Sequence, residues 1–127
     1  MKEINNKLRK LLQGKKLSQL EKETGIFSSQ LSIWMRGSDF STIDMLQKCA
    51  IAANMRVYFD GSDDDIEQRL LNIVLFETQN YSTLNLEHMT GVKGNTFWAM
   101  RNGMTPRLST LLKVCEALEI ELNFELK

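Results

Sequence analysis

The chain has 127 residues, of which 43% are hydrophobic and 25% are charged, the balance of an ordinary globular protein. This length suits one compact domain or two very small ones. The formal net charge is zero, which argues weakly against nucleic-acid binding, and no apolar run approaches the roughly 18 residues of a membrane span.

The first part of the chain predicts four helices followed by a strand. The helices are expected at residues 2–13, 18–23, 28–36 and 42–53. The first of them has apolar residues at the three- and four-residue spacing of one helix face, namely Ile4, Leu8, Leu11 and Leu12. Gly25 and Gly37 are expected to end the second and third helices. Val57 and Phe59 alternate with polar residues, as in a half-buried strand.

The second part of the chain repeats this order. Its helices are expected at residues 64–77, 82–89, 95–102 and 109–118. Asp63 or Asp64 is expected to cap the first of these helices, and Ser82 the second. A closing strand within residues 122–126 is expected to pair with the strand at residues 57–59, or across a dimer, because a lone strand leaves its edges unpaired.

A shift of 66 positions aligns the two parts of the sequence. Thr24-Gly25-Ile26 then falls on Thr90-Gly91-Val92, and Leu20-Glu21 falls on Leu86-Glu87. Gly37 falls on Gly103. This internal repeat predicts two modules, residues 1–60 and residues 61–127, joined at a Gly-Ser pair.

The zero net charge conceals an uneven distribution. Residues 1–60 hold ten Lys and Arg against six Asp and Glu, a charge of +4, and residues 61–127 hold six against ten, a charge of −4. Within the second repeat, residues 88–115 contain four basic residues and no acidic one. Because local charge attracts a polyanion more than net charge does, this window favours nucleic-acid binding.

Two short helices joined by a glycine turn are typical of a helix-turn-helix. Both repeats carry the pattern Leu-Glu-x-x-x-Gly-[Ile/Val]-x-x-x-x-[Leu/Phe]-x-x-[Trp/Met]-x-x-Gly. The pattern and the helix order resemble the lambda-repressor-like (Cro-type) family of DNA-binding domains, over residues 4–53 and 66–118. The resemblance implies a mainly α fold with two tandem four-helix helix-turn-helix modules, each followed by a short β-strand.

The resemblance also implies which residues meet DNA. In this family the second helix of the motif presents its N-terminal end to the major groove, and the residues near its other end approach the phosphates. In the first repeat this assigns DNA binding to Ser28, Ser29, Gln30, Ser32 and Arg36. In the second repeat it assigns Lys93, Gly94, Asn95, Thr96, Trp98, Arg101, Asn102 and Arg107.

These residue types suit that role. The amides of Gln30 and Asn95 can form paired hydrogen bonds with adenine. The basic residues would contact phosphates, and Gly94 would let the backbone approach closely. Trp98 aligns with Ser32, so it is exposed and either contacts a thymine methyl or sugar or belongs to a protein interface. Both interpretations of Trp98 stay open.

The two repeats share one departure from the family pattern. Glu21 and Glu87 occupy the position after the helix-two Leu, where the family usually has a small residue such as Ala. Two explanations are open: the helices lie further apart than usual, or these carboxylates reach a basic partner.

Catalysis and metal binding have little support in the sequence. His88 is the only histidine and is expected at the surface, and no Ser or Cys has a His partner at a recognisable spacing. Cys49 and Cys115 lie in apolar helical stretches without metal-ligand spacing, so they are expected to be reduced core thiols. The N-terminus lacks the apolar region of a secretory signal. We therefore expect a cytoplasmic protein that is not an enzyme and holds no metal or cofactor.

The sequence predicts a sequence-specific DNA-binding transcriptional regulator, a small repressor of bacterial or phage type. Its partner would be double-stranded DNA, with a homodimer as a further option. The alternative is a protein-binding module or inhibitor that retains the helix-turn-helix fold and binds its partner through the Trp98 surface. A mixed case, in which only one repeat binds DNA, also stays open.

Overall fold

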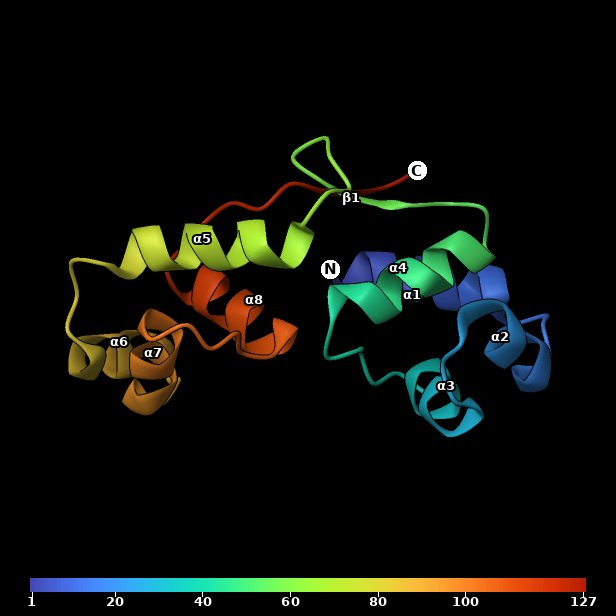
Figure 1. Cartoon of the computed structure of the whole chain (residues 1–127), viewed down its shortest axis with the longest axis horizontal. Helices are drawn as coiled ribbons and strands as arrows, with labels where there is room; N and C mark the ends of the chain where they lie inside the picture. Colours follow the sequence, from blue (N-terminus) through green and yellow to red (C-terminus); the bar gives the residue numbers. More distant parts are fainter. The chain divides into compact units, whose positions relative to one another are not determined.

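The computed structural model describes all residues from Met1 to Lys127 and contains eight α-helices and one two-stranded sheet (Figure 1). The chain divides into two compact units. Unit 1 comprises Met1–Asp64 and Asn123–Lys127, and unit 2 comprises Asp65–Leu122. The mainly helical architecture agrees with the expected fold class, and none of the helices combines the length and apolar character that crossing a bilayer requires.

Unit 1 contains four helices and both strands. They are α1 (Lys2–Leu12), α2 (Leu17–Thr24), α3 (Ser28–Met35), α4 (Ile43–Ala52), β1 (Val57–Phe59) and β2 (Phe124–Leu126). Helix α2 packs against α3 and α4, and α4 also contacts α1 and β1. The core is formed by large side chains with almost no solvent exposure, among them Leu8, Leu12, Leu20, Leu31, Trp34, Leu46 and Phe59.

The buried face of α1 differs from the expected one. Leu11 is exposed, and the buried side chains of the helix are Ile4, Asn5, Leu8 and Leu12. Asn5 can be buried because both polar ends of its amide have a partner: its Oδ1 accepts a hydrogen bond from Trp34 Nε1 at 2.9 Å, and its Nδ2 donates to the Met1 carbonyl at 3.0 Å. The helix is therefore turned toward Asn5, which moves Leu11 out of the core.

Unit 2 contains the other four helices. They are α5 (Ile66–Thr78), α6 (Thr83–Thr90), α7 (Gly94–Arg101) and α8 (Leu108–Ala117). Helix α6 packs against α7 and α8, and α5 packs against α8. The core of this unit is built from Leu70, Val74, Leu86, Phe97, Met100, Leu111 and Val114.

Of the two helix caps expected in unit 2, one is confirmed and the other is not. Ser82 caps α6 as expected, since its Oγ accepts a hydrogen bond from the Asn85 amide at 3.1 Å. The cap position of α5 is Asp65 rather than Asp63 or Asp64. Asp65 has a φ of 42°, in the left-handed region, and its side chain makes no cap hydrogen bond.

The sheet joins the two chain segments that make up unit 1. Strands β1 and β2 pair antiparallel, which confirms the expectation that the two strand segments pair with each other. Phe59 lies opposite Phe124, and their rings stack with centroids 4.7 Å apart. The other edge of β1 is closed by Gln47, whose side-chain amide exchanges two hydrogen bonds with the backbone of Val57. The last five residues of the chain thus complete unit 1.

Candidate nucleic-acid interface

The turn between α2 and α3 is held by local hydrogen bonds. Gly25 has a φ of 74°, a conformation that favours glycine, and its N–H donates to the Glu21 carbonyl at 2.8 Å. The buried Thr24 hydroxyl donates to the Leu20 carbonyl at 2.6 Å and accepts from the Ile26 amide at 3.1 Å. The turn has no unsatisfied buried side-chain polar atom, so the start of α3 is set firmly against the end of α2.

The turn between α6 and α7 is built in the same way. Gly91 has a φ of 73°, and its N–H donates to the Glu87 carbonyl at 2.9 Å. The Thr90 hydroxyl donates to Leu86 at 2.7 Å and accepts from the Val92 amide at 3.1 Å. The Thr-Gly pair therefore has the same function in both units.

Glu21 and Glu87 cap the helix that follows each turn. Glu21 Oε1 accepts a hydrogen bond from the backbone amide of Ser28 at 2.8 Å, and Glu87 Oε1 accepts one from Gly94 at 2.9 Å. A carboxylate at this place satisfies a free amide of the first turn and interacts favourably with the positive end of the helix. The partner of each carboxylate within the chain is thus a backbone amide and not a basic side chain.

Gly94 allows a close approach within the protein. A Cβ atom at this position would lie 3.3 Å from the Thr83 carbonyl oxygen, which is tighter than almost all real contacts of this kind. The absence of a side chain therefore lets the start of α7 pack against the start of α6. The structure supports this packing role for Gly94 directly, whereas the expected approach to DNA stays a prediction.

The outer faces of α3 and α7 present the expected polar residues. Leu31 and Trp34 anchor α3 in the core, while Ser29 and Gln30 are exposed and Ser28 and Ser32 are partly exposed. On α7, Phe97 and Met100 are buried, which leaves Asn95 and Trp98 exposed and Thr96 partly exposed. Each helix therefore has an accessible N-terminal end that carries hydrogen-bonding side chains.

Several of the expected phosphate-binding side chains have partners inside the protein. The Arg101 guanidinium donates to the carbonyls of Thr78 at 2.9 Å and Tyr81 at 2.6 Å, so it ties α7 to the segment between α5 and α6. Asn102 donates to the Trp98 carbonyl at 2.8 Å. Arg36 donates to the backbone carbonyl and hydroxyl of Ser32, at 3.3 and 3.2 Å.

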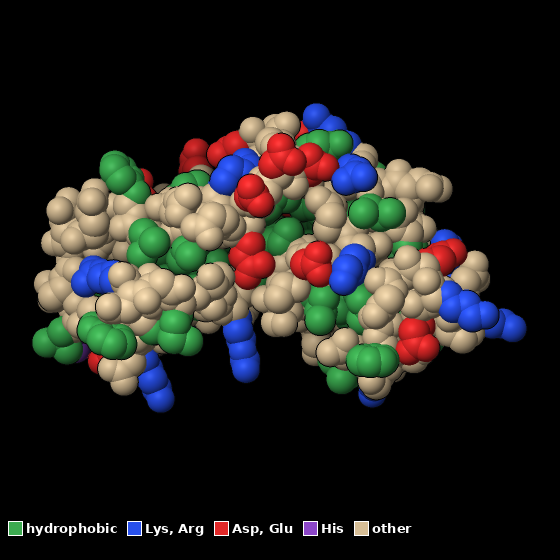
Figure 2. Space-filling view, viewed as in Figure 1, with side chains coloured by type: hydrophobic (Ala, Val, Ile, Leu, Met, Phe, Trp, Pro, Cys, Tyr) green, Lys and Arg blue, Asp and Glu red, His purple; other side chains and the backbone are tan.

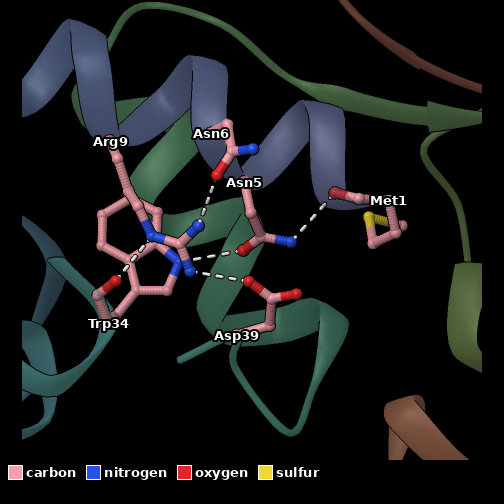
Figure 3. A network of polar contacts seen from close by, with 6 residues as sticks. All are labelled: Met1, Asn5, Asn6, Arg9, Trp34 and Asp39. Atoms are coloured by element: carbon pink, nitrogen blue, oxygen red, sulfur yellow. Dashed lines mark hydrogen bonds and ion pairs between the residues drawn. The ribbon is translucent and has the colours of Figure 1, made fainter. Parts of the chain in front are cut away.

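Unit 1 has a comparable arginine on α1 (Figure 3). The guanidinium of Arg9 donates to the Trp34 carbonyl, to Asn6 Oδ1 and to Asp39 Oδ1, and it lies 5.2 Å from the centre of the Trp34 ring. Figure 3 shows the side chain of Arg9 directed across α1 toward the end of α3. This arginine holds α1, α3 and the following loop together, a role that the sequence analysis missed.

The accessible cations of unit 2 are Lys93, Arg107 and Lys113. Lys93 and Arg107 stand at the N-cap positions of α7 and α8, and both are exposed. The exposed ammonium group of Lys113 lies beside the turn, within 3.7 Å of the place where a Cβ of Gly91 would be. None of the three forms an ion pair within the chain. They lie in the acid-free window of the sequence, and basic side chains project from this unit in the space-filling view (Figure 2).

Large apolar side chains are also exposed on the two candidate helices. Trp98 is 64% exposed, as expected from its alignment with Ser32. Phe27, directly before α3, is 70% exposed, and Ile33 on the outer face of α3 is 51% exposed. Figure 2 shows such apolar side chains at the surface over α3 and over α6 and α7. The sequence analysis missed Phe27 and Ile33, although the spacing of Ile33 from the buried Leu31 and Trp34 places it on the outer face.

Each unit has a shallow hollow beside its candidate helix. In unit 1 the hollow has a volume of about 190 Å³ and is lined by Gln30, Ile33, Trp34, Ser38, Asp39, Phe40, Ser41 and Met45. In unit 2 it has about 260 Å³ and is lined by Asn95, Thr96, Ala99, Met100, Met104, Thr105 and Pro106. Six of these positions correspond through the 66-residue shift, so the hollows occupy the same place in the two repeats.

Comparison with protein families identifies one segment of the chain. Residues 73–123 match the model of the Cro/C1-type HTH DNA-binding domain. This segment includes α6, the Gly91 turn, α7 and α8. Searches of curated proteins and of solved structures found no match. Residues 73–123 are therefore similar to this kind of helix-turn-helix domain.

Proposed function

We propose that the chain is a sequence-specific DNA-binding transcriptional regulator, a small repressor of bacterial or phage type that acts in the cytoplasm. The observation that carries this proposal is the coincidence of the family match with the geometry of α6 and α7. The matched segment presents an exposed Asn95 at the start of α7, and the accessible cations Lys93 and Arg107 stand at two helix starts. Base-specific amides next to phosphate-binding cations are what major-groove recognition requires.

We further propose that the first repeat is a second module of the same kind. Three features support this: the matching Thr-Gly turns, the matching Glu caps and the corresponding hollows. The modules would be residues 1–60 and 61–127, with α3 and α7 as the two recognition helices. Since these helices carry different side chains, the operator would contain two unlike half-sites.

The proposed contacts divide into base and phosphate contacts. Gln30 and Asn95 would bind adenine, and Ser28, Ser29, Ser32, Thr96 and Trp98 would complete the base contacts. Lys93 and Arg107 would bind phosphates. Arg36 and Asn102 would have to exchange an internal hydrogen bond for a phosphate, and Arg101 would act by holding α7 in place.

Fluorescence anisotropy with DNA from upstream of its own gene tests this function, at two salt concentrations. Specific binding should weaken steeply as salt rises, because phosphate contacts release counterions. The double variant Gln30→Ala with Asn95→Ala should lose about tenfold or more in affinity, since each paired base contact discriminates by about 1–3 kcal/mol.

Glu121→Ala is the matched control, because Glu121 is exposed and lies outside both candidate helices. It should bind as the unmodified chain does. Binding that ignores both DNA sequence and the double variant would contradict the proposal.

A protein-binding role is the second candidate, and the exposure of Trp98 favours it. An exposed tryptophan is a frequent anchor of protein interfaces. Capture of a defined protein partner that Trp98→Ala abolishes, without any loss of DNA affinity, would support this role. Self-association of the chain would bring further recognition helices into one complex. Sedimentation with and without DNA measures the oligomeric state.

A further inference from the structure

The outer face of α3 is more apolar than that of α7. Ile33 is 51% exposed there, and the position that corresponds to it in α7 is Ala99. Phe27, which precedes α3, corresponds to Lys93. Half of the Ile33 surface is therefore in water, whereas Leu31 and Trp34 of the same helix are buried, and this exposed half is free to contact a partner.

Ile33 lies next to a hydrogen-bonding amide. Ile33 and Gln30 both line the hollow of unit 1, and Trp34, Phe40 and Met45 form other parts of its wall. The side-chain amide of Gln30 is exposed and forms no hydrogen bond within the chain, so it is available to a ligand. The same hollow therefore offers an apolar wall and a free amide side by side.

Two arginines close to α3 have partners inside unit 1. Arg9 is bound to Trp34, Asn6 and Asp39, and Arg36 is bound to Ser32. These two guanidinium groups would have to exchange an internal hydrogen bond for a phosphate contact.

The major groove displays one apolar group, the 5-methyl group of thymine, and adenine is the base that pairs best with a glutamine amide. We propose that Ile33 is a specificity-determining residue of unit 1, whose half-site contains a thymine with its 5-methyl group packed against Ile33 and an adenine bound by Gln30. This inference rests on the proposed DNA-binding function. Ala99 has only one methyl group at the corresponding position, so unit 2 would discriminate less between thymine and a base without that methyl group.

The test removes the methyl group from DNA and the isoleucine from the protein. The full chain first selects its binding sites from random-sequence duplex DNA. Each thymine of the selected site is then replaced by uracil, which pairs with adenine in the same way but lacks the 5-methyl group. At one thymine the replacement should lower the affinity about fourfold, which corresponds to the free energy gained by burying one methyl group.

Two protein variants complete the experiment. With Ile33→Ala, the uracil penalty at that thymine should fall below about twofold, because no apolar partner remains for the methyl group. Ile51→Ala is the matched control, since Ile51 is 49% exposed and lies on α4. It should keep the full fourfold penalty, and circular dichroism checks that both variants retain their helices.

The possible results are distinct. A uracil penalty that Ile33→Ala removes and Ile51→Ala keeps would support the inference. A selected site in which every thymine tolerates uracil, or a penalty that persists in Ile33→Ala, would overturn it while leaving the DNA-binding function intact. Failure to select any sequence would overturn the proposed function and this inference together.

Discussion

At the scale of single residues, the two cysteines are buried and form no disulfide. Burial raises the pKa of the Cys49 thiol to about 12. Burial, with a smaller effect from the nearby Glu77 carboxylate, raises the pKa of the Cys115 thiol to about 11. Both side chains are unpaired core groups, as the sequence predicted.

The raised pKa values predict low reactivity and a loss of stability at high pH. Native protein should react with a thiol reagent at pH 9 only after urea unfolding, because the buried thiols stay protonated there. Since the unfolded thiols lose protons near pH 9 and the folded ones only near pH 11–12, their contribution to stability is complete below pH 9 and declines above it.

Absorbance of the released thiol product measures the reaction. Cys49→Ala and Cys115→Ala serve as controls, because each should remove one of the two reactive groups in urea. Rapid labelling of the folded chain at pH 8 would contradict the burial of these thiols.

At the scale of elements, the Glu caps connect the two helices of each turn. Each cap joins a residue of α2 or α6 to the first turn of α3 or α7, so it stabilises one helix and orients it relative to the other. A carboxylate accepts this hydrogen bond strongly because of its charge, and a neutral amide oxygen accepts it less strongly.

Removal of the cap should therefore destabilise the corresponding unit. Glu87→Ala should lower the free energy of unfolding by about 1 kcal/mol, the usual value of a lost N-cap, and Glu87→Gln by less. Urea denaturation followed by circular dichroism measures the difference. Glu116→Ala is the control, because Glu116 is exposed on α8 and its carboxylate forms no hydrogen bond or ion pair within the chain. Equal stability of the Glu87→Ala and Glu116→Ala variants would show that the cap contributes nothing.

At the scale of the whole molecule, the chain enters unit 1 twice. It leaves at Asp64 and returns at Asn123, and the returning segment forms β2. Phe124 stacks on the buried Phe59, and the backbones of Arg56 and Lys127 exchange two hydrogen bonds of 2.7 and 3.0 Å. Residues 123–127 thus stabilise unit 1 through their contacts with β1.

A change in β2 should affect unit 1 and spare unit 2. Phe124→Ala should lower the free energy of unfolding of unit 1 by about 1–2 kcal/mol, because the apolar contacts and the stacking of the half-buried ring are lost. Hydrogen exchange should accelerate in β1 and α4 and stay unchanged in α6 and α7. Asn123→Ala is the control, since Asn123 contributes its backbone carbonyl to the sheet. Faster exchange in α6 and α7 with Phe124→Ala would contradict the division into these units.

Much of this architecture follows from local patterns. The eight helices lie within about two residues of their expected limits, and Ser82 and the turn glycines have their predicted roles. These features depend on spacing along the chain and on the backbone preferences of single residue types. The candidate DNA-binding residues could also be proposed in this way, since the family pattern places them next to the turn glycine.

The partners of long polar side chains could not be predicted from local patterns. Arg9 binds Asp39 and Trp34, Arg101 binds Thr78 and Tyr81, and each Glu cap spans seven residues. The burial of Asn5 in place of Leu11 depends likewise on the distant Trp34.

The sequence by itself therefore determined the order of the helices and the positions of the turns. Only the tertiary structure decided which charged and amide groups are used inside the protein and which remain available to a partner. The physical reason is that a hydrogen bond or ion pair requires two groups to meet in space, and packing brings together residues that are far apart in the chain.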